Sequence, residues 1–108
     1  MTLSTHVLDT ARGEPAAGVA VALYRRDGDD WTPVARGHTD ADGRLRDWVP
    51  ASAWGVGRYR LVFDTGGYLG GDAFFPEAVV IFQVSAPDRH HHVPLLLSPF
   101  GLSTYRGS

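Results

Sequence analysis

The chain has 108 residues, of which 44% are hydrophobic and 20% are charged, values that predict one globular domain over residues 1–108 and exclude a disordered chain. Its formal net charge is -2 at pH 7, and without a basic stripe it lacks the electrostatic footprint of a nucleic-acid-binding protein. The absence of cysteine excludes disulfides, thiolate metal sites and cysteine nucleophiles, and favours a reducing compartment, which we interpret as the cytoplasm.

Short apolar segments separated by 13 Gly and 7 Pro run along the chain, and no stretch keeps a helical period. This pattern predicts an all-β protein. The longest apolar runs, such as "AVVIF", are too short to span a bilayer, so no membrane partner is expected. The predicted strands are Leu3–Asp9, Val19–Arg25, Trp31–Thr39, Arg44–Trp48, Gly57–Asp64, Ala78–Ser85, His91–Ser98 and Leu102–Arg106. Eight short strands at this spacing predict a two-sheet antiparallel β-sandwich.

Turn residues separate several of these strands. The "DGDD" stretch at Asp27–Asp30 predicts a hairpin loop, and "DADG" at Asp40–Gly43 places a glycine where a positive φ costs little. The one region long enough for a helix is Thr65–Phe75, but it contains four glycines. Each interior glycine costs about 1 kcal/mol against alanine, so at most one short helix of one or two turns is expected there.

Alternation along the strands places a mixture of polar and apolar side chains on the face opposite the core. The inward set of the first and of the last long strand is Leu3, Thr5, Val7, Val93, Leu95 and Leu97. The predicted outer face carries Ser4, His6, Leu8, His92, Pro94, Leu96, Ser103 and Tyr105. Apolar residues on an outer face indicate a partner, and the simplest partner is another copy of the chain.

The run "RHHHV" contains an H-x-H spacing that can chelate zinc. Its two imidazoles would come from His90 and His92, and His6 or His38 could supply a third nitrogen. Because no carboxylate spacing supports such a site, our prediction is catalysis without a metal or other cofactor. A metal-dependent hydrolase that uses His90 and His92 remains an alternative.

The stretch "DGRLRDW" places Arg44 directly after a tight turn. A rigid backbone at that position can hold a guanidinium so that it grips a planar anion in bidentate fashion. Arg46 shares the same strand face, and we interpret it as a solvated arginine.

Four motifs occur in order along the chain: "LSTHVLDTARGEPA", "TDADGRL", "FFPE" and "HVPLLLSPFGLSTYRGS". Together they resemble the 5-hydroxyisourate hydrolase (transthyretin-related) protein family over essentially the whole chain. The resemblance implies a sandwich of two four-stranded sheets and a homotetramer built as a dimer of dimers, with active sites at the dimer–dimer interface. It also implies ring opening of 5-hydroxyisourate, the product of urate oxidation, on the route of purine catabolism to allantoin.

The same resemblance implies catalytic roles for His6, Arg44 and His92, and a role in substrate binding for Tyr105 of "YRGS". The resemblance also implies a channel across the centre of the tetramer. We expect Ser103 and Tyr105 to face this channel, and Ser108 to orient substrate or water. The "YRGS" motif separates the enzymes from transthyretin, the hormone carrier. A non-catalytic carrier of small aromatic ligands is the remaining alternative.

Overall fold

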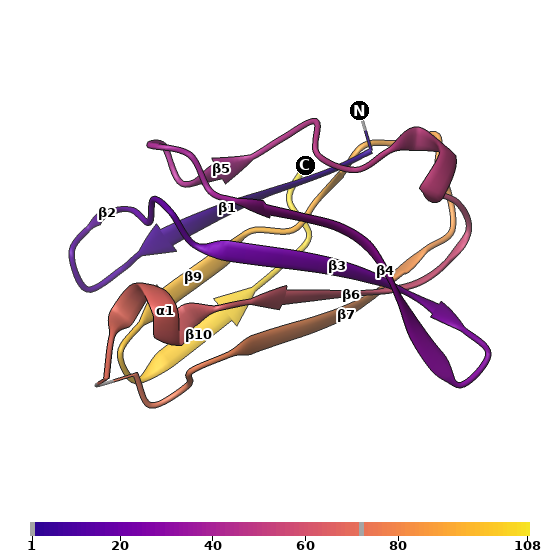
Figure 1. The fold of residues 1–108 in the computed structure, drawn as a ribbon. Coiled ribbons are helices and arrows are strands. Elements are labelled where there is room, and N and C mark those ends of the chain that lie inside the picture. Colours follow the sequence, from indigo (N-terminus) through magenta and orange to yellow (C-terminus); the bar gives the residue numbers. More distant parts are fainter. Residues whose placement is uncertain (1, 72) are drawn as a thin grey trace.

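Two β-sheets packed face to face make up the structure, a computed structural model that describes residues 2–71 and 73–108 (Figure 1). The larger sheet contains β1 (Leu3–Asp9), β2 (Glu14–Pro15), β5 (Arg44–Leu45), β8 (His91–His92), β9 (Leu95–Ser98) and β10 (Gly101–Thr104). The smaller sheet contains β3 (Ala20–Asp27), β4 (Asp30–His38), β6 (Gly57–Phe63) and β7 (Ala78–Val84), in the order β4-β3-β6-β7. The predicted all-β sandwich is confirmed, with ten strands among the described residues instead of eight.

Several predicted strands end one or two residues early, among them the last, which ends at Thr104 instead of Arg106, and two others differ more. The strand expected over Arg44–Trp48 ends at Leu45, because Asp47 adopts a left-handed φ of 54° that an extended strand does not allow. The strand expected over His91–Ser98 divides into β8 and β9. Pro94 lies in the gap, where its lack of an N–H removes a ladder hydrogen bond.

The first strand, β1, pairs with neighbours running in both directions. It is antiparallel to β2 and β5 and parallel to β8 and β9. The expected antiparallel pairing therefore holds throughout the smaller sheet but not for the contact between the first and last strands. There the register aligns Leu3 with His91 and Val7 with Leu95.

The core forms from the inward side chains of both sheets. Its buried apolar residues are Leu3, Val7, Ala16, Val19, Val21, Leu23, Val49, Tyr59, Leu61, Phe63, Ala78, Val84, Val93, Leu95 and Leu97. The alternation predicted for β1 and β9 is confirmed at these positions. Two residues predicted on the solvent-facing side, Ser4 and Pro94, are buried instead. Pro94 lies beside the last strand, where the Thr104 hydroxyl donates a hydrogen bond to the Pro94 carbonyl at 2.8 Å.

The helical content is as small as the glycines predict. A five-residue helix, α1 (Thr65–Leu69), begins after Asp64, whose side chain accepts a hydrogen bond from the Gly67 N–H. A 3-10 turn, η1, covers Ala51–Ala53. The rest of the window predicted to hold a helix is irregular where it is described, and residue 72 lies outside the described residues. None of the helices in residues 2–71 and 73–108 has the length and apolar character needed to cross a membrane.

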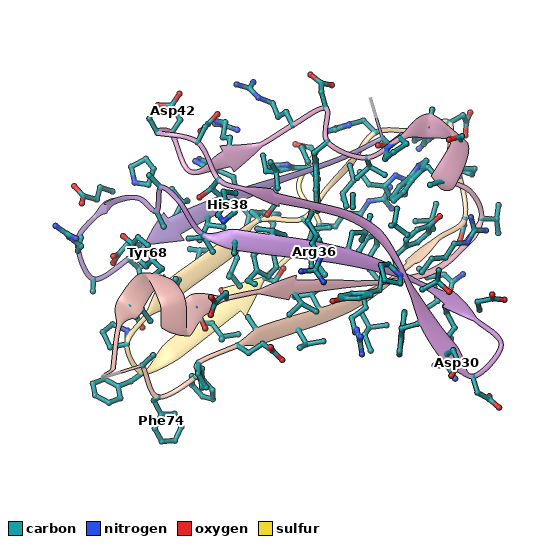
Figure 2. All side chains as sticks on the ribbon, viewed as in Figure 1. Asp30, Arg36, His38, Asp42, Tyr68 and Phe74 are labelled. Atoms are coloured by element: carbon teal, nitrogen blue, oxygen red, sulfur yellow. The ribbon has the colours of Figure 1, made fainter. Side chains whose placement is uncertain are left out.

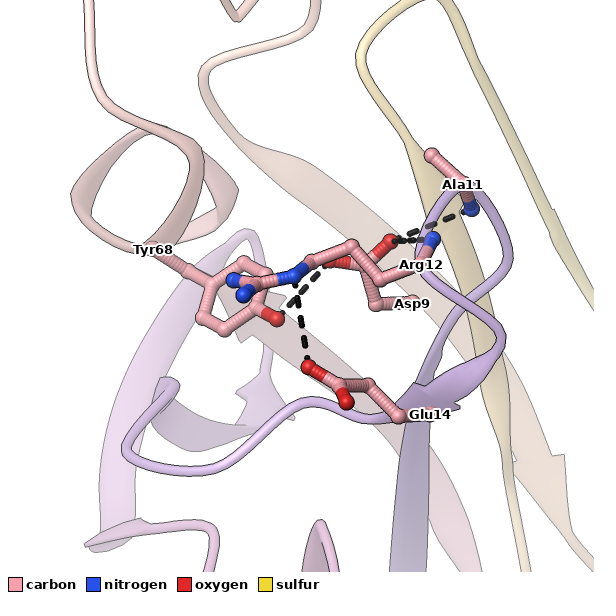
Figure 3. Close-up of polar contacts among 5 residues, drawn as sticks. All are labelled: Asp9, Ala11, Arg12, Glu14 and Tyr68. Atoms are coloured by element: carbon pink, nitrogen blue, oxygen red, sulfur yellow. Dashed lines mark hydrogen bonds and ion pairs between the residues drawn. The ribbon is translucent and has the colours of Figure 1, made fainter.

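A buried carboxylate joins the end of β1 to this helix (Figure 3). Asp9 is only 2% exposed, and its Oδ1 accepts hydrogen bonds from the N–H groups of Ala11 and Arg12 at 3.1 and 3.0 Å. Its Oδ2 accepts a hydrogen bond of 2.8 Å from the Tyr68 hydroxyl. Burial, followed by the hydrogen bond and charge of Asp9, raises the pKa of Tyr68 above its ordinary value of 10.0. Both oxygens of Asp9 are therefore satisfied within the fold.

Replacing Tyr68 with Phe should lower the free energy of unfolding by about 1–3 kcal/mol, because it removes a hydrogen-bond donor from a buried acceptor. Urea denaturation followed by circular dichroism measures the change. Tyr24→Phe is the matched control, since the Tyr24 ring packs on Arg60 and would be kept. An equal loss in both variants would contradict the anchoring role of the Tyr68 hydroxyl.

Candidate active site

Backbone pairing around β1 brings the predicted catalytic residues His6, Arg44 and His92 onto neighbouring strands, and we call this arrangement the row. His6 stands opposite Arg44 of β5, and Ser4, two residues earlier on the same strand, stands opposite His92 of β8. On the far side of His92, an isolated bridge pairs it with Gly107. Because adjacent strands lie about 4.8 Å apart, this register alone brings residues far apart in the sequence onto one patch.

His6 is held by the turn that precedes β5. Its Nε2 lies 2.9 Å from the carbonyl oxygen of Asp42. A carbonyl can only accept, so Nε2 carries the hydrogen, and in the neutral ring Nδ1 keeps the lone pair. The ring nitrogen that can accept a proton in His6 is therefore Nδ1.

The same turn is rigid for reasons visible in its sequence. The Asp40 side chain accepts hydrogen bonds from the N–H groups of Asp42 and Arg44 at 2.9 and 3.0 Å. The bond from the Arg44 backbone is the main cause that lowers the pKa of Asp40 below its ordinary value. Gly43 has the positive φ predicted for it, 73°, and any Cβ there would overlap the Val7 carbonyl of β1. The turn thus fixes the start of β5 and, with it, Arg44.

His92 contacts a buried hydroxyl. Its Nδ1 lies 2.7 Å from Ser4 Oγ, and the same oxygen lies 2.8 Å from Nε2 of His90. Burial is the largest cause that lowers the pKa of His92 below 6.5, followed by the positive charges of His90, Arg44 and His6. Its imidazole therefore stays neutral, and able to accept a proton, at pH values where an ordinary histidine becomes charged.

The segment after β10 folds back against His92. The Gly107 N–H donates a hydrogen bond of 2.8 Å to the His92 carbonyl, and a Cβ at Gly107 would overlap the His92 ring. The "YRGS" segment is therefore attached to the site by its backbone, while the Ser108 side chain next to Gly107 is exposed.

A cavity of about 200 Å³ separates this segment from β7. Its lining residues are Val80, Phe82, Gln83, His91, His92, Val93, Thr104, Tyr105 and Arg106. Tyr105 and His92 therefore share a cavity. Ser103 lines a different depression, beside Leu96, because regular strand alternation ends with β10 at Thr104. The structure thus brings Tyr105 to His92 and leaves Ser103 apart from both.

Two of the imidazoles considered for zinc lie close together, but on a hydroxyl group. His90 and His92 both contact Ser4 Oγ, and His38 lies on β4 of the other sheet. Within residues 2–71 and 73–108, no three side chains of His, Cys, Asp or Glu are grouped so that they could hold a metal ion.

The hydrogen bonds of Ser4 and the close approach of Gly107 were not predicted from the sequence. A signal for Ser4 was present, since alternation places it on the same face as His6. No spacing rule links Ser4 to His90, because the contact spans 86 residues of sequence.

The fold and the site together describe a β-sandwich protein whose candidate active site, with His6, Arg44 and His92, lies on the strands of its larger sheet. The model of the HIUase/Transthyretin family matches residues 3–107, and the chain belongs to this family. The resemblance found in the sequence motifs is confirmed.

Individual proteins agree with this assignment. The chain is 50% identical over 113 residues to 5-hydroxyisourate hydrolase of Caulobacter vibrioides, covering 98% of this chain and 97% of that protein. The structure of Klebsiella pneumoniae 5-hydroxyisourate hydrolase superimposes with a TM-score of 0.84 at 40% identity and full coverage of both chains. Sea bream transthyretin in complex with thyroxine superimposes with a TM-score of 0.92 at 34% identity, covering 99% and 95% of the two chains.

Replacing Gly107 with Ala should lower the turnover at this site by about 10-fold or more, because the added Cβ would displace the His92 ring. Errors of about 1 Å in the position of a catalytic group cost up to about 100-fold in rate. The thermal midpoint should change little, because Gly107 lies outside the core. Gly101→Ala is the matched control, since its Cβ would meet only the Ser98 hydroxyl, at 3.5 Å. Unchanged turnover in the Gly107 variant would show that His92 tolerates displacement.

Proposed function

We propose that this chain hydrolyses 5-hydroxyisourate, opening its ring in the degradation of urate. The observation that carries the proposal is the row in which His6, Arg44 and His92 meet across three neighbouring strands. The names of its relatives support the same reaction, since the Caulobacter vibrioides protein and the solved Klebsiella pneumoniae structure are both 5-hydroxyisourate hydrolases.

Hydrolysis of a cyclic amide needs a water that loses a proton, an oxygen on which negative charge is stabilised, and a leaving nitrogen that gains a proton. Neutral imidazoles perform the proton transfers. His6 offers Nδ1 and His92 offers Nε2, the nitrogens opposite those held by Asp42 and Ser4. Arg44 holds the substrate and offsets charge on its oxygens. No step in this scheme uses a metal or another cofactor.

Tyr105, Ser108 and Ser103 have the remaining roles in the proposed site. Tyr105 shares a cavity with His92 and would orient substrate or water through its hydroxyl. Ser108 follows Gly107, which is bonded to His92, and would act in the same way. Ser103 lies apart from both in the protomer, so its role requires the surface of a second copy.

A carrier function is the rival suggested by the likeness to a transthyretin that holds thyroxine. The polar contacts of this chain favour the enzyme. A carrier of aromatic ligands has no need of an imidazole held in one tautomer by a carbonyl, as His6 is, or of a second imidazole held on a buried hydroxyl, as His92 is.

His6→Asn, Arg44→Ala and His92→Asn should each lower the rate by at least about 100-fold, the scale of one lost catalytic group. The measurement follows the ultraviolet absorbance of freshly generated 5-hydroxyisourate, with spontaneous decay subtracted. His38→Asn and Arg36→Ala on β4 are the matched controls, since both positions are exposed on the other sheet.

Near-normal turnover in any one of the three variants would remove that residue from the site. The same assay separates the alternatives. A carrier would leave the spontaneous decay unchanged, and a metal-dependent hydrolase would lose activity on exhaustive chelation and regain it with zinc.

We also propose a homotetramer, a dimer of dimers, in the cytoplasm. The edge strands β7 and β10 lie on the same side of the sandwich (Figure 1), and an exposed edge strand with apolar side chains favours pairing with another chain. Exposed apolar residues cluster there: Phe74, Phe75, Val79, Ile81, Phe100, Leu102 and Tyr105. Figure 2 shows Phe74 projecting away from the body of the protein.

A second contact between copies is supported by Leu8 and Leu96, which are partly exposed on the outer face of the larger sheet. The lack of cysteine supports a reducing location.

Light scattering at micromolar protein should therefore return four protomer masses. Ile81→Lys, which places a charge on the exposed edge of β7, should shift the mass towards smaller species. Thr32→Lys, on the opposite edge strand of the same sheet, should not. A monomer mass for the unaltered protein would contradict the assembly, and with it any site shared between subunits.

A further inference from the structure

We propose that Ser4 and His90 act on His92 as a proton relay, carrying protons between its site-facing nitrogen and the solvent. Both are positioning residues that act through His92, and the inference rests on the proposed function. Three observations carry it: the two short contacts of Ser4 Oγ, the burial of Ser4, and the exposure of His90.

The geometry is that of a continuous chain of hydrogen bonds. Ser4 Oγ lies 2.7 Å from His92 Nδ1 and 2.8 Å from His90 Nε2. Ser4 is only 4% exposed, so its hydroxyl has no competing solvent, whereas the side chain of His90 lies at the surface. The chain therefore begins at a half-buried imidazole, crosses a buried hydroxyl and ends in solvent.

A serine hydroxyl has one hydrogen, and this limits the chain to two neutral arrangements. In the first, Nδ1–H of His92 donates to Oγ and the hydroxyl donates to Nε2 of His90, so Nε2 of His92 carries a lone pair. In the second, Nε2–H of His90 donates to Oγ and the hydroxyl donates to Nδ1 of His92, so Nε2 of His92 carries a hydrogen. The first arrangement makes His92 a base and the second makes it an acid.

Proton transfer converts one arrangement into the other. When Nε2 of His92 accepts a proton from the attacking water, its Nδ1–H bond breaks as a new O–H bond forms at Ser4. The former hydroxyl hydrogen passes to Nε2 of His90, and Nδ1 of His90 releases a proton to solvent. The water has lost one proton, the solvent has gained one, and no electrons have changed hands.

The second half of the reaction reverses these exchanges. His92 donates its Nε2 hydrogen to the substrate nitrogen that leaves the carbonyl carbon. Nδ1 of His92 then takes the hydrogen of the Ser4 hydroxyl, and Ser4 Oγ takes the Nε2 hydrogen of His90. His90 then recovers a proton from solvent. The relay thus lets His92 act first as a base and then as an acid, beside His6, the second proton-transfer group of the proposed site.

The charges around His92 favour moving the proton onwards. Arg44 of β5, His6 of β1 and His90 lie near His92, and positive charge on any of them disfavours a lasting imidazolium there. Arg106 and Tyr105 of the folded-back segment line the same cavity as His92, and no carboxylate is among the residues that line it. A proton that reaches the exposed His90 escapes this environment.

The test is chemical rescue in the full-length protein. His90→Ala should lower kcat for 5-hydroxyisourate by about 10-fold or more in dilute phosphate buffer, a part of the 100- to 10,000-fold range of general acid–base help, and leave KM nearly unchanged. Added imidazole should restore kcat in a saturable manner, because a small base can replace an exposed shuttle group. His38→Ala, which removes an exposed histidine from the other sheet, should show neither the loss nor the rescue.

Ser4→Ala separates the relay from a general effect of buffer. It should also lower kcat, but imidazole should not restore it, since the missing hydroxyl is buried. Circular dichroism checks that this variant is folded. Full kcat in His90→Ala, or a loss that imidazole leaves unchanged, would overturn the relay. Both outcomes are distinct from a failure of the proposed function, in which the unaltered protein itself would not accelerate hydrolysis.

Discussion

The pairing of β1 along both of its edges is the constraint on which the site depends. One edge takes β5 in antiparallel register and places Arg44 beside His6, and the other takes β8 in parallel register and places His92 beside Ser4. A slip of one residue would turn each of these side chains to the opposite face, because strand side chains alternate with a period of two. The buried residues Leu3 and Val7 prevent such a slip, so core packing and site geometry are specified by the same seven-residue strand.

Much of this arrangement could be predicted from the sequence. Alternation in "LSTHVLD" correctly placed the core side of β1, and the glycine of "DADG" correctly indicated a positive φ at residue 43. The glycines of the 65–75 segment correctly indicated a short helix, and the described residues of this segment contain one of five residues. These features are local, and each follows from backbone conformations that a few neighbouring residues prefer.

What could not be predicted depends on contacts between distant residues. The early end of β5 follows from the conformation of Asp47, which its residue type does not demand. The division of the last long strand follows from Pro94, a local signal that the prediction overlooked, whereas the burial of Pro94 follows from the position of the distant Thr104. The contact of Ser4 with two histidines exists only because the first and last strands meet, and no local pattern reports which strands meet. The separation of Ser103 from Tyr105 likewise reflects where β10 ends.

The parallel contact between β1 and the end of the chain also bears on the order in which the protein folds. The Thr5 hydroxyl bonds to a carbonyl 88 residues away, and closing so long a loop carries an entropic cost that short hairpins avoid. The smaller sheet is built largely from strands that are neighbours in sequence, β3 with β4 and β6 with β7. Its loop-closure entropy cost is therefore lower. We therefore expect a refolding chain to regain much of the strand content of the smaller sheet before β1 pairs with β8 and β9 and completes the site around His92. On this expectation, recovery of activity reports the pairing of β1 with the end of the chain and not the formation of the sandwich as a whole.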